Sequence, residues 1–288
     1  MGNGSLAPVT EPELQLTRYA RHDPAHCLCP GLFRAMRKQE RDRPRLDVKY
    51  EYAGAEIRFR GPTALGADDL RVLAAVVALA GRDGTDLTTA PKSEVGRMLR
   101  ALLGTEGELT VSTPSRYVHT SMRQLAREAG YSDGGGAILS HVRQCLDRLD
   151  CTKVQVTRNR VAWSTWLLAR VIDLETGDVA IAVNPQLAAG IIGGQHARID
   201  MSELRALSSD AATLIFHRLC GWLDPGSTAR VTVPTLADYV WPTPAPNGAA
   251  ARKRRQRIRA AMAAIGQLAG WTVRGNCDVY AITRPPVD

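Results

Sequence analysis

The residues best suited to bind a ligand lie in one basic run near the C-terminus. Residues 252–259 read Arg-Lys-Arg-Arg-Gln-Arg-Ile-Arg and carry six positive charges with no acidic residue among them. Guanidinium groups bind phosphate in pairs of hydrogen bonds, and lysine binds it as a point charge. From Ile258 onward, Met262, Ile265 and Leu268 recur at helical spacing. The run is therefore predicted to open a helix with one apolar face and one cationic face that can bind a polyanion.

The predicted helix spans residues 249–269 and is followed by two strand-like runs around Gly275-Asn276. In a groove of nucleic acid, such a helix meets phosphates and base edges, where arginine suits guanine and glutamine suits adenine. Gln256 is the candidate for adenine, and Arg274 at the hairpin is a candidate for the minor groove or the backbone. A solvated basic face and a simple solvent hairpin are the alternatives. The residues of this region that we predict to bind DNA are Arg252, Lys253, Arg254, Arg255, Gln256, Arg257, Arg259 and Arg274.

Composition also favours an anionic partner. The 288 residues carry a formal net charge of +8, which points to nucleic acid or an acidic membrane surface. Residues 247–288 hold eight basic and two acidic residues, so most of the excess lies in a small C-terminal unit. The longest apolar run, residues 72–80, is too short to cross a bilayer. With no secretory signal recognised, we expect no membrane partner, a cytoplasmic location and reduced cysteines.

A second helix with a polar outer face is predicted in the first half of the chain. The pattern indicates helices over 121–129 and 137–149, a glycine-rich turn between them, and strands over 153–157, 161–171 and 179–183. This is the order of a winged helix-turn-helix. Asp147 on the outer face opposes contact with phosphate along the whole helix. A partner surface and plain solvent exposure are alternatives for this face, whose predicted DNA-binding residues are Ser140, His141, Arg143, Gln144 and Arg148.

The C-terminal third repeats that order of elements. The pattern predicts helices over 209–223, 235–240 and 249–269 and strands over 230–233, 271–274 and 279–283, with Trp222, Trp241 and Trp271 in the core. Earlier segments predict a helix over 30–41, a hairpin over 46–60, and helices over 68–80 and 93–103. The predicted fold class is α+β, with two tandem winged-helix domains. The predicted division is a mobile N-terminal tail over 1–24, an N-terminal winged-helix domain with a helix and hairpin extension over 25–194, and a C-terminal winged-helix domain over 195–288.

Motifs of catalysis are absent from the sequence. It contains no Gly-x-x-x-x-Gly-Lys-Ser/Thr phosphate loop, no Gly-x-Ser-x-Gly and no His-Glu-x-x-His. His22, His26, Cys27 and Cys29 are of types that suit zinc, but Cys-x-Cys lacks the usual two-residue separation and no second ligand pair stands nearby. We therefore predict no enzymatic activity, no cofactor and no metal site, and interpret the cluster as a local packing motif.

Several short runs are shared, in the same order, with one protein family. They are 21–28 (Arg-His-Asp-Pro-Ala-His-Cys-Leu), 30–34, 65–71, 193–199, 218–226, 239–242, 252–255 and 282–285. Over about residues 20–286 the chain thus resembles the RepC family of replication initiators from IncQ-type plasmids. The resemblance implies a non-catalytic protein that binds direct repeats, called iterons, in the double-stranded vegetative origin. It also implies that the protein helps to open an adjacent AT-rich region and that the plasmid-encoded helicase and primase are recruited.

The resemblance further implies a division of labour between the two predicted domains. The C-terminal winged helix would be the principal base reader, and the N-terminal one would contact the DNA backbone and mediate a homodimer. Monomers would occupy iterons, and dimers would limit copy number. A sequence-specific transcriptional regulator with the same folds is the alternative function, because it needs the same basic recognition helices. A primase or nuclease is disfavoured, since the sequence lacks clustered acids for metal ions.

Overall fold

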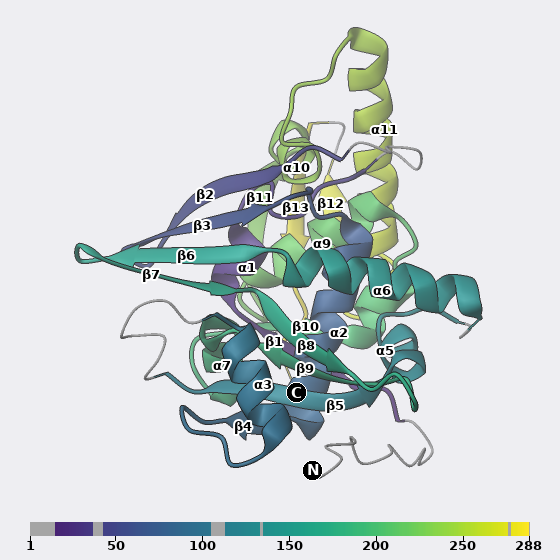
Figure 1. Cartoon of the computed structure of the whole chain (residues 1–288). Coiled ribbons are helices and arrows are strands. Elements are labelled where there is room, and N and C mark those ends of the chain that lie inside the picture. The colour runs from purple at the N-terminus through teal and green to yellow at the C-terminus, as the bar shows by residue number, and fades with distance from the viewer. Residues whose placement is uncertain (1–14, 37–42, 105–112, 133–134, 276–277, 288) are drawn as a thin grey trace.

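The computed structural model describes residues 15–36, 43–104, 113–132, 135–275 and 278–287. An apolar helix, α2 (Ala67–Asp83), runs through the centre of the first half, and its residues from Leu70 to Ala80 are all buried. A helix that is apolar all round belongs in a core rather than on a surface. Several helices pack against it (Figure 1), namely α5 (Met122–Glu128), α6 (Gly136–Asp150), α7 (Pro185–Ile192), α8 (Met201–Ala206) and α9 (Asp210–Trp222).

One antiparallel sheet lies beside α2 and α5. Its strand order is β4-β5-β9-β8, where the strands are β4 (Thr85–Leu87), β5 (Ser115–Ser121), β8 (Leu168–Ile172) and β9 (Asp178–Val183). All six residues of β9 are buried, as expected for a central strand covered on both faces. Helix α3 (Glu94–Leu102), capped by Ser93, contacts β8 and β9. The sequence prediction omitted β4 and β5.

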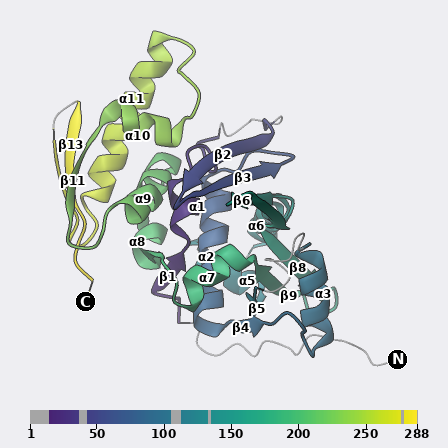
Figure 2. The ribbon, with the colours of Figure 1, turned by 90° about the vertical axis from the view of Figure 1, so that its left-hand side faces the viewer.

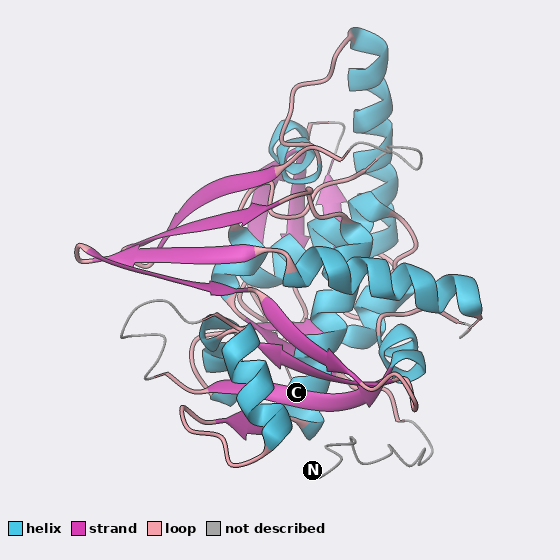
Figure 3. Cartoon of the chain, in the orientation of Figure 1, coloured by secondary structure: helices cyan, strands magenta, loops and turns pink. Residues whose placement is uncertain are grey.

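A second antiparallel sheet is built from two hairpins that are far apart in sequence. Its order is β2-β3-β6-β7, where the strands are β2 (Leu46–Tyr52), β3 (Ala55–Gly61), β6 (Lys153–Arg158) and β7 (Val161–Trp166). Both hairpins, which extend to the left in Figure 3, turn through two residues of positive φ, Ala53-Gly54 and Asn159-Arg160. The predicted strand over 161–171 is therefore wrong, because the chain leaves this sheet at Leu167 and continues as β8 in the other.

The N-terminal residues that the structure describes are ordered elements. Strand β1 (Tyr19–His22) pairs with β10 (Ala197–Asp200), and helix α1 (Pro24–Leu28) is capped by Asp23. The interpretation of residues 1–24 as a mobile tail is therefore wrong over Tyr19–His22, because this strand is paired with one about 180 residues away and Ala20 and His22 are fully buried. The helix expected over 30–41 is not formed over its described residues, 30–36, which make turns and isolated bridges.

The last third follows the order that the sequence predicts. Its elements are α9, β11 (Thr228–Thr232), α10 (Val233–Val240), α11 (Gly248–Ile265), β12 (Thr272–Gly275) and β13 (Val279–Thr283), with sheet order β11-β13-β12. Helix α11 ends at Ile265, not at 269, and its C-cap is Gly266. Gly270 then turns the chain toward β12 with a φ of +76°.

The apolar core is continuous from the first elements to the last. Its buried residues run from Ala20 in β1 to Ile282 in β13, and α2 contacts α9 directly (Figure 2). Trp241 and Trp271 are buried as predicted, whereas Trp222 is 40% exposed because the final residue of α9 faces away from the packed side. The predicted boundary at residues 194 and 195 stays a prediction. Within the described residues, no helix combines the length and hydropathy needed to cross a membrane.

Candidate nucleic-acid interface

Helix α11 carries its basic residues on a face turned away from the core. Ile258, Ala261, Met262 and Ile265 are fully buried, and the helix packs there on α9 and α10. Asn247 caps the first turn by accepting a hydrogen bond from the amide of Ala250 at 2.9 Å. Figure 1 shows the N-terminal half of α11 projecting beyond the rest of the molecule. The exposed polar side chains on this half and the next turn are Arg252, Lys253, Arg255, Gln256, Arg257 and Arg259.

Arg254 differs from its neighbours in the run. It is half-buried, its guanidinium carbon lies 5.3 Å from the centre of the Trp241 ring, and its Nη1 donates to the carbonyl of Thr243 at 2.6 Å. These contacts tie the start of α11 to the loop that follows α10. Arg254 therefore serves the fold of the region, and the cations turned to solvent are its neighbours.

The hairpin after α11 presents Arg274 at its end. Arg274 is exposed and lies opposite Ala281 in the register of β12 and β13. Gly275 follows where no larger residue fits, because a Cβ there would lie 2.3 Å from the carbonyl oxygen of Val279. The other residue of the predicted turn, Asn276, lies outside the described residues. The structure thus brings Arg274 to an exposed hairpin next to the helix that carries the basic run.

The outer face of α6 is only partly open. Ser140, Arg143 and Gln144 are exposed, as the sequence predicts. His141 and Arg148 instead lie against acids of α2: His141 Nε2 is 3.2 Å from Asp68, and Arg148 Nε is 2.8 Å from Asp69. The hydrogen bond from His141 is the main reason that the pKa of Asp68 falls below its usual value, against the opposing effect of burial.

Two further acids shape this face of α6. Asp147 is exposed and forms an ion pair with Arg170 of β8. That pairing offsets the negative charge that Asp147 would otherwise present to phosphate. Asp69 is completely buried and accepts hydrogen bonds from the amide of Gly66 and from Arg43 as well as Arg148. Sequence reasoning missed Asp69, because its arginine partners Arg43 and Arg148 lie far from it in the sequence.

Comparison with solved structures defines the class of fold. The structure of the selenomethionine derivatives of domain 2 and domain 3 of RctB is 12% identical, with a TM-score of 0.51 over 92% of this chain and 99% of that one. A second structure of RctB domains 2-3 is 10% identical, with a TM-score of 0.48 over 91% of this chain and 96% of that one. At such identities the likeness with the first shows a shared mixed α+β fold and no more. None of the curated proteins matches this chain.

The family model of Replication protein C (RepC) matches residues 14–286. The chain belongs to the RepC family, since this match covers nearly all of it. Membership supports a role as an initiator of plasmid or chromosome replication and implies binding to DNA. Because the family role implies binding to DNA, the basic face of α11 and the exposed part of α6 are candidate DNA-binding surfaces.

Proposed function

We propose that this protein initiates plasmid replication by binding direct repeats, the iterons, in double-stranded origin DNA. The observation that carries the proposal is the exposed face of α11, where five cations flank Gln256 on a helix whose opposite face is buried. A helix of this kind fits the major groove, and its positive N-terminal end adds to the attraction for phosphate. Arg252, Lys253, Arg257 and Arg259 contact phosphate or guanine, and Gln256 pairs with adenine.

The repeated order of elements supports two winged-helix units. In the first half, α2, β5, α5, α6, β8 and β9 come in this order, with β4 and α3 inserted before β5 and with β6 and β7 inserted before β8. Three of the four strands in their sheet have the order β5-β9-β8. In the last third, α9, β11, α10, α11, β12 and β13 follow in sequence, and the sheet order is β11-β13-β12. Because α6 and α11 hold the same place in the two orders, we assign both as recognition helices. Arg274 on the second hairpin contacts the minor groove or the backbone.

Engagement of the DNA by two tethered units strains the duplex. Bending or kinking costs less at flexible AT-rich steps, so binding at the repeats lowers the cost of opening an adjacent AT-rich region. The strand separation itself then requires a helicase, and the plasmid-encoded helicase and primase are the proposed partners. The protein acts without catalysis of its own, in keeping with a DNA-binding family and with a sequence that lacks the catalytic motifs sought.

Footprinting and affinity measurements on origin DNA test the placement of α11. Gln256→Ala and Arg257→Ala should each weaken binding to the repeat by roughly 5- to 150-fold, the equivalent of about 1–3 kcal/mol for a bidentate base contact. Arg97→Ala, which removes an exposed arginine from α3, is the matched control and should leave affinity unchanged. Unchanged repeat binding by both α11 variants at moderate salt would overturn the placement.

Permanganate reactivity of thymines tests the initiation step separately. Wild-type protein should make the AT-rich segment beside the repeats reactive, and Arg257→Ala should do so only at higher concentration. Repeat binding without any opening, even with the plasmid helicase present, would instead identify a transcriptional regulator.

A further inference from the structure

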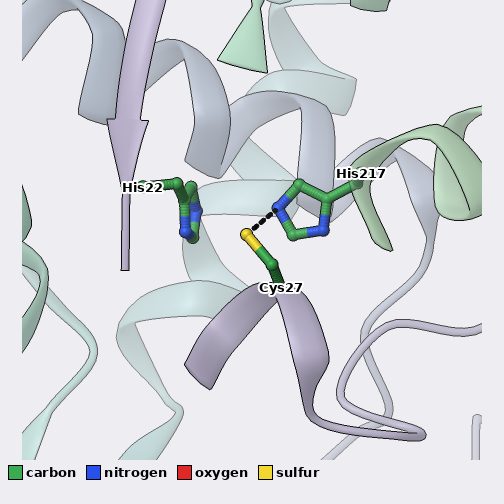
Figure 4. A group of neighbouring side chains, drawn as sticks. All are labelled: His22, Cys27 and His217. Atoms are coloured by element: carbon green, nitrogen blue, oxygen red, sulfur yellow. Dashed lines mark hydrogen bonds between the residues drawn. The ribbon is translucent and has the colours of Figure 1, made fainter. Parts of the chain in front are cut away.

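Three side chains of ligand type meet in the core between the first elements of the chain and α9. His22 ends β1, Cys27 lies in α1 and His217 lies in α9, and their exposed fractions are 0, 4 and 3%. One ligand atom of each lies within 4.8 Å of the other two, and Cys27 Sγ is 3.4 Å from His217 Nε2 (Figure 4). Sequence reasoning grouped Cys27 and His22 with His26 and Cys29, and it missed His217 because that residue is 190 positions from Cys27.

The imidazole of His22 has one nitrogen without a partner. Its Nδ1 lies 3.3 Å from the carbonyl oxygen of Asp23, which can only accept, so Nδ1 carries the hydrogen. Nε2 is then an acceptor that is buried and has no hydrogen-bond partner among the described residues. A buried acceptor left unpaired is costly and calls for a physical reason.

We propose that His22, Cys27 and His217 bind one zinc ion. Zinc takes imidazole nitrogen and thiolate sulfur in tetrahedral geometry, which requires neighbouring ligand atoms to lie roughly 3.3–3.6 Å apart. The contact between Cys27 and His217 already meets that spacing. The other pairs of ligand atoms are no more than 4.8 Å apart, so they must contract by at most about 1.5 Å. The carbonyl of Asp23 orients the ring of His22, as outer partners of ligating histidines do.

The surroundings supply what a zinc ion would further need. A cavity of about 20 Å³ is lined by Cys27 and His217, but not by His22, and it has room for one water that would serve as the fourth ligand. Zinc binds the thiolate form of cysteine, so the proton of the Cys27 thiol is released on binding. The nearby carboxylate of Asp23, which accepts from His26 Nδ1 at 2.8 Å, offsets the remaining positive charge.

The zinc ion would link segments that are far apart in the sequence. His22 and Cys27 come from β1 and α1, and His217 comes from the helix on which α11 packs. Helices α1 and α9 approach so closely that a Cβ on Gly221 would lie 2.5 Å from that of Cys27. Zinc would therefore hold β1 and α1 against α9, the helix on which α11 packs. It would also stabilise the folded protein, and the stabilisation would increase with the free zinc concentration.

Metal binding by the full-length protein tests the site. The protein is stripped with a chelator, then titrated with zinc, and in parallel with cobalt as a spectroscopic probe. We expect one metal ion per chain, a thiolate-to-cobalt charge-transfer band, and an unfolding equilibrium shifted about 100-fold toward the folded state at free zinc 100 times the Kd. A stripped wild-type protein that takes up no zinc would overturn the proposal.

Variants distinguish this site from chance binding by other cysteines. Cys27→Ala should abolish both the charge-transfer band and the stabilisation by zinc. Cys29→Ala removes a second buried thiol that lines the same cavity, so it is the matched control and should retain both. If Cys27→Ala kept the band, the assignment would be wrong. If Cys27→Ala did not fold, His22→Gln would be measured in its place. Stabilisation of this variant by zinc to the same extent as the wild type would also contradict the assignment.

Discussion

Arg254 and Arg257 lie about one turn apart in α11 but have different surroundings. Arg254 rests over Trp241 and donates to the carbonyl of Thr243, whereas Arg257 is exposed. We expect Arg254→Ala to lower the free energy of unfolding by about 1–3 kcal/mol, through the lost charged hydrogen bond and cation–π contact. Arg257→Ala should leave stability within about 0.5 kcal/mol and weaken DNA binding instead. Urea unfolding of both variants, beside their affinities for the repeat, checks this separation of roles; equal losses of stability would contradict it.

Asp69 of α2 holds α6 in place through its hydrogen bond with Arg148. It is fully buried and accepts hydrogen bonds from Arg43, Arg148 and the amide of Gly66. Asp69→Ala leaves those donors unpaired, so we expect a loss of about 3–5 kcal/mol in the free energy of unfolding. Asp83→Ala breaks a largely exposed pair with Arg82 and should cost less than about 1 kcal/mol. Chemical denaturation of the two variants gives the comparison, and similar losses would show that Asp69 has no special role.

At the scale of elements, the projecting half of α11 is stabilised by its N-cap, and we expect bound DNA to stabilise it further. Asn247 supplies the side-chain cap, and the first turn of the helix contains no acid. We expect Asn247→Ala to cost about 1 kcal/mol and to speed hydrogen exchange over residues 249–257. Repeat DNA should slow exchange over the same residues. Thr232→Ala, which removes the equivalent cap of α10, should leave that segment unaffected. If repeat DNA does not change hydrogen exchange over residues 249–257, the DNA contact lies elsewhere on the protein.

The elements that the sequence predicted are those with local signals. The spacing of Ile258, Met262 and Ile265 predicted which side of α11 is buried, and Ser209 marked the start of α9. The pairing of β1 with β10 and of β3 with β6 joins distant segments, so no local period reveals it. The same difference between local and distant contacts decides which features of the site residues could be predicted. Exposed Arg257 follows from its helical register, whereas the partner of Arg148 is an acid on another helix.

At the scale of the whole molecule, the two candidate recognition helices are held apart by the core. Helix α11 packs on α9, α9 contacts α2, and α2 contacts α6, an order that Figure 2 shows across the molecule. The route between the helices thus passes through buried apolar contacts, not through a free linker. A single DNA duplex that meets both faces must therefore fit a fixed separation, which is the physical basis for the proposed strain on the duplex.

The salt dependence of binding tests whether both faces meet the same DNA. Each phosphate contact contributes about 0.9 to the slope of log affinity against log salt. Arg143→Ala on α6 and Lys253→Ala on α11 should each reduce that slope by about 0.9, and the double variant should reduce it by about twice as much. Gln256→Ala should leave the slope unchanged and lower only the preference for the repeat over random DNA. Arg97→Ala on α3 keeps the same net charge as Arg143→Ala and controls for long-range attraction. If Arg143→Ala behaves like Arg97→Ala, the face of α6 lies off the DNA and is free to meet a protein partner.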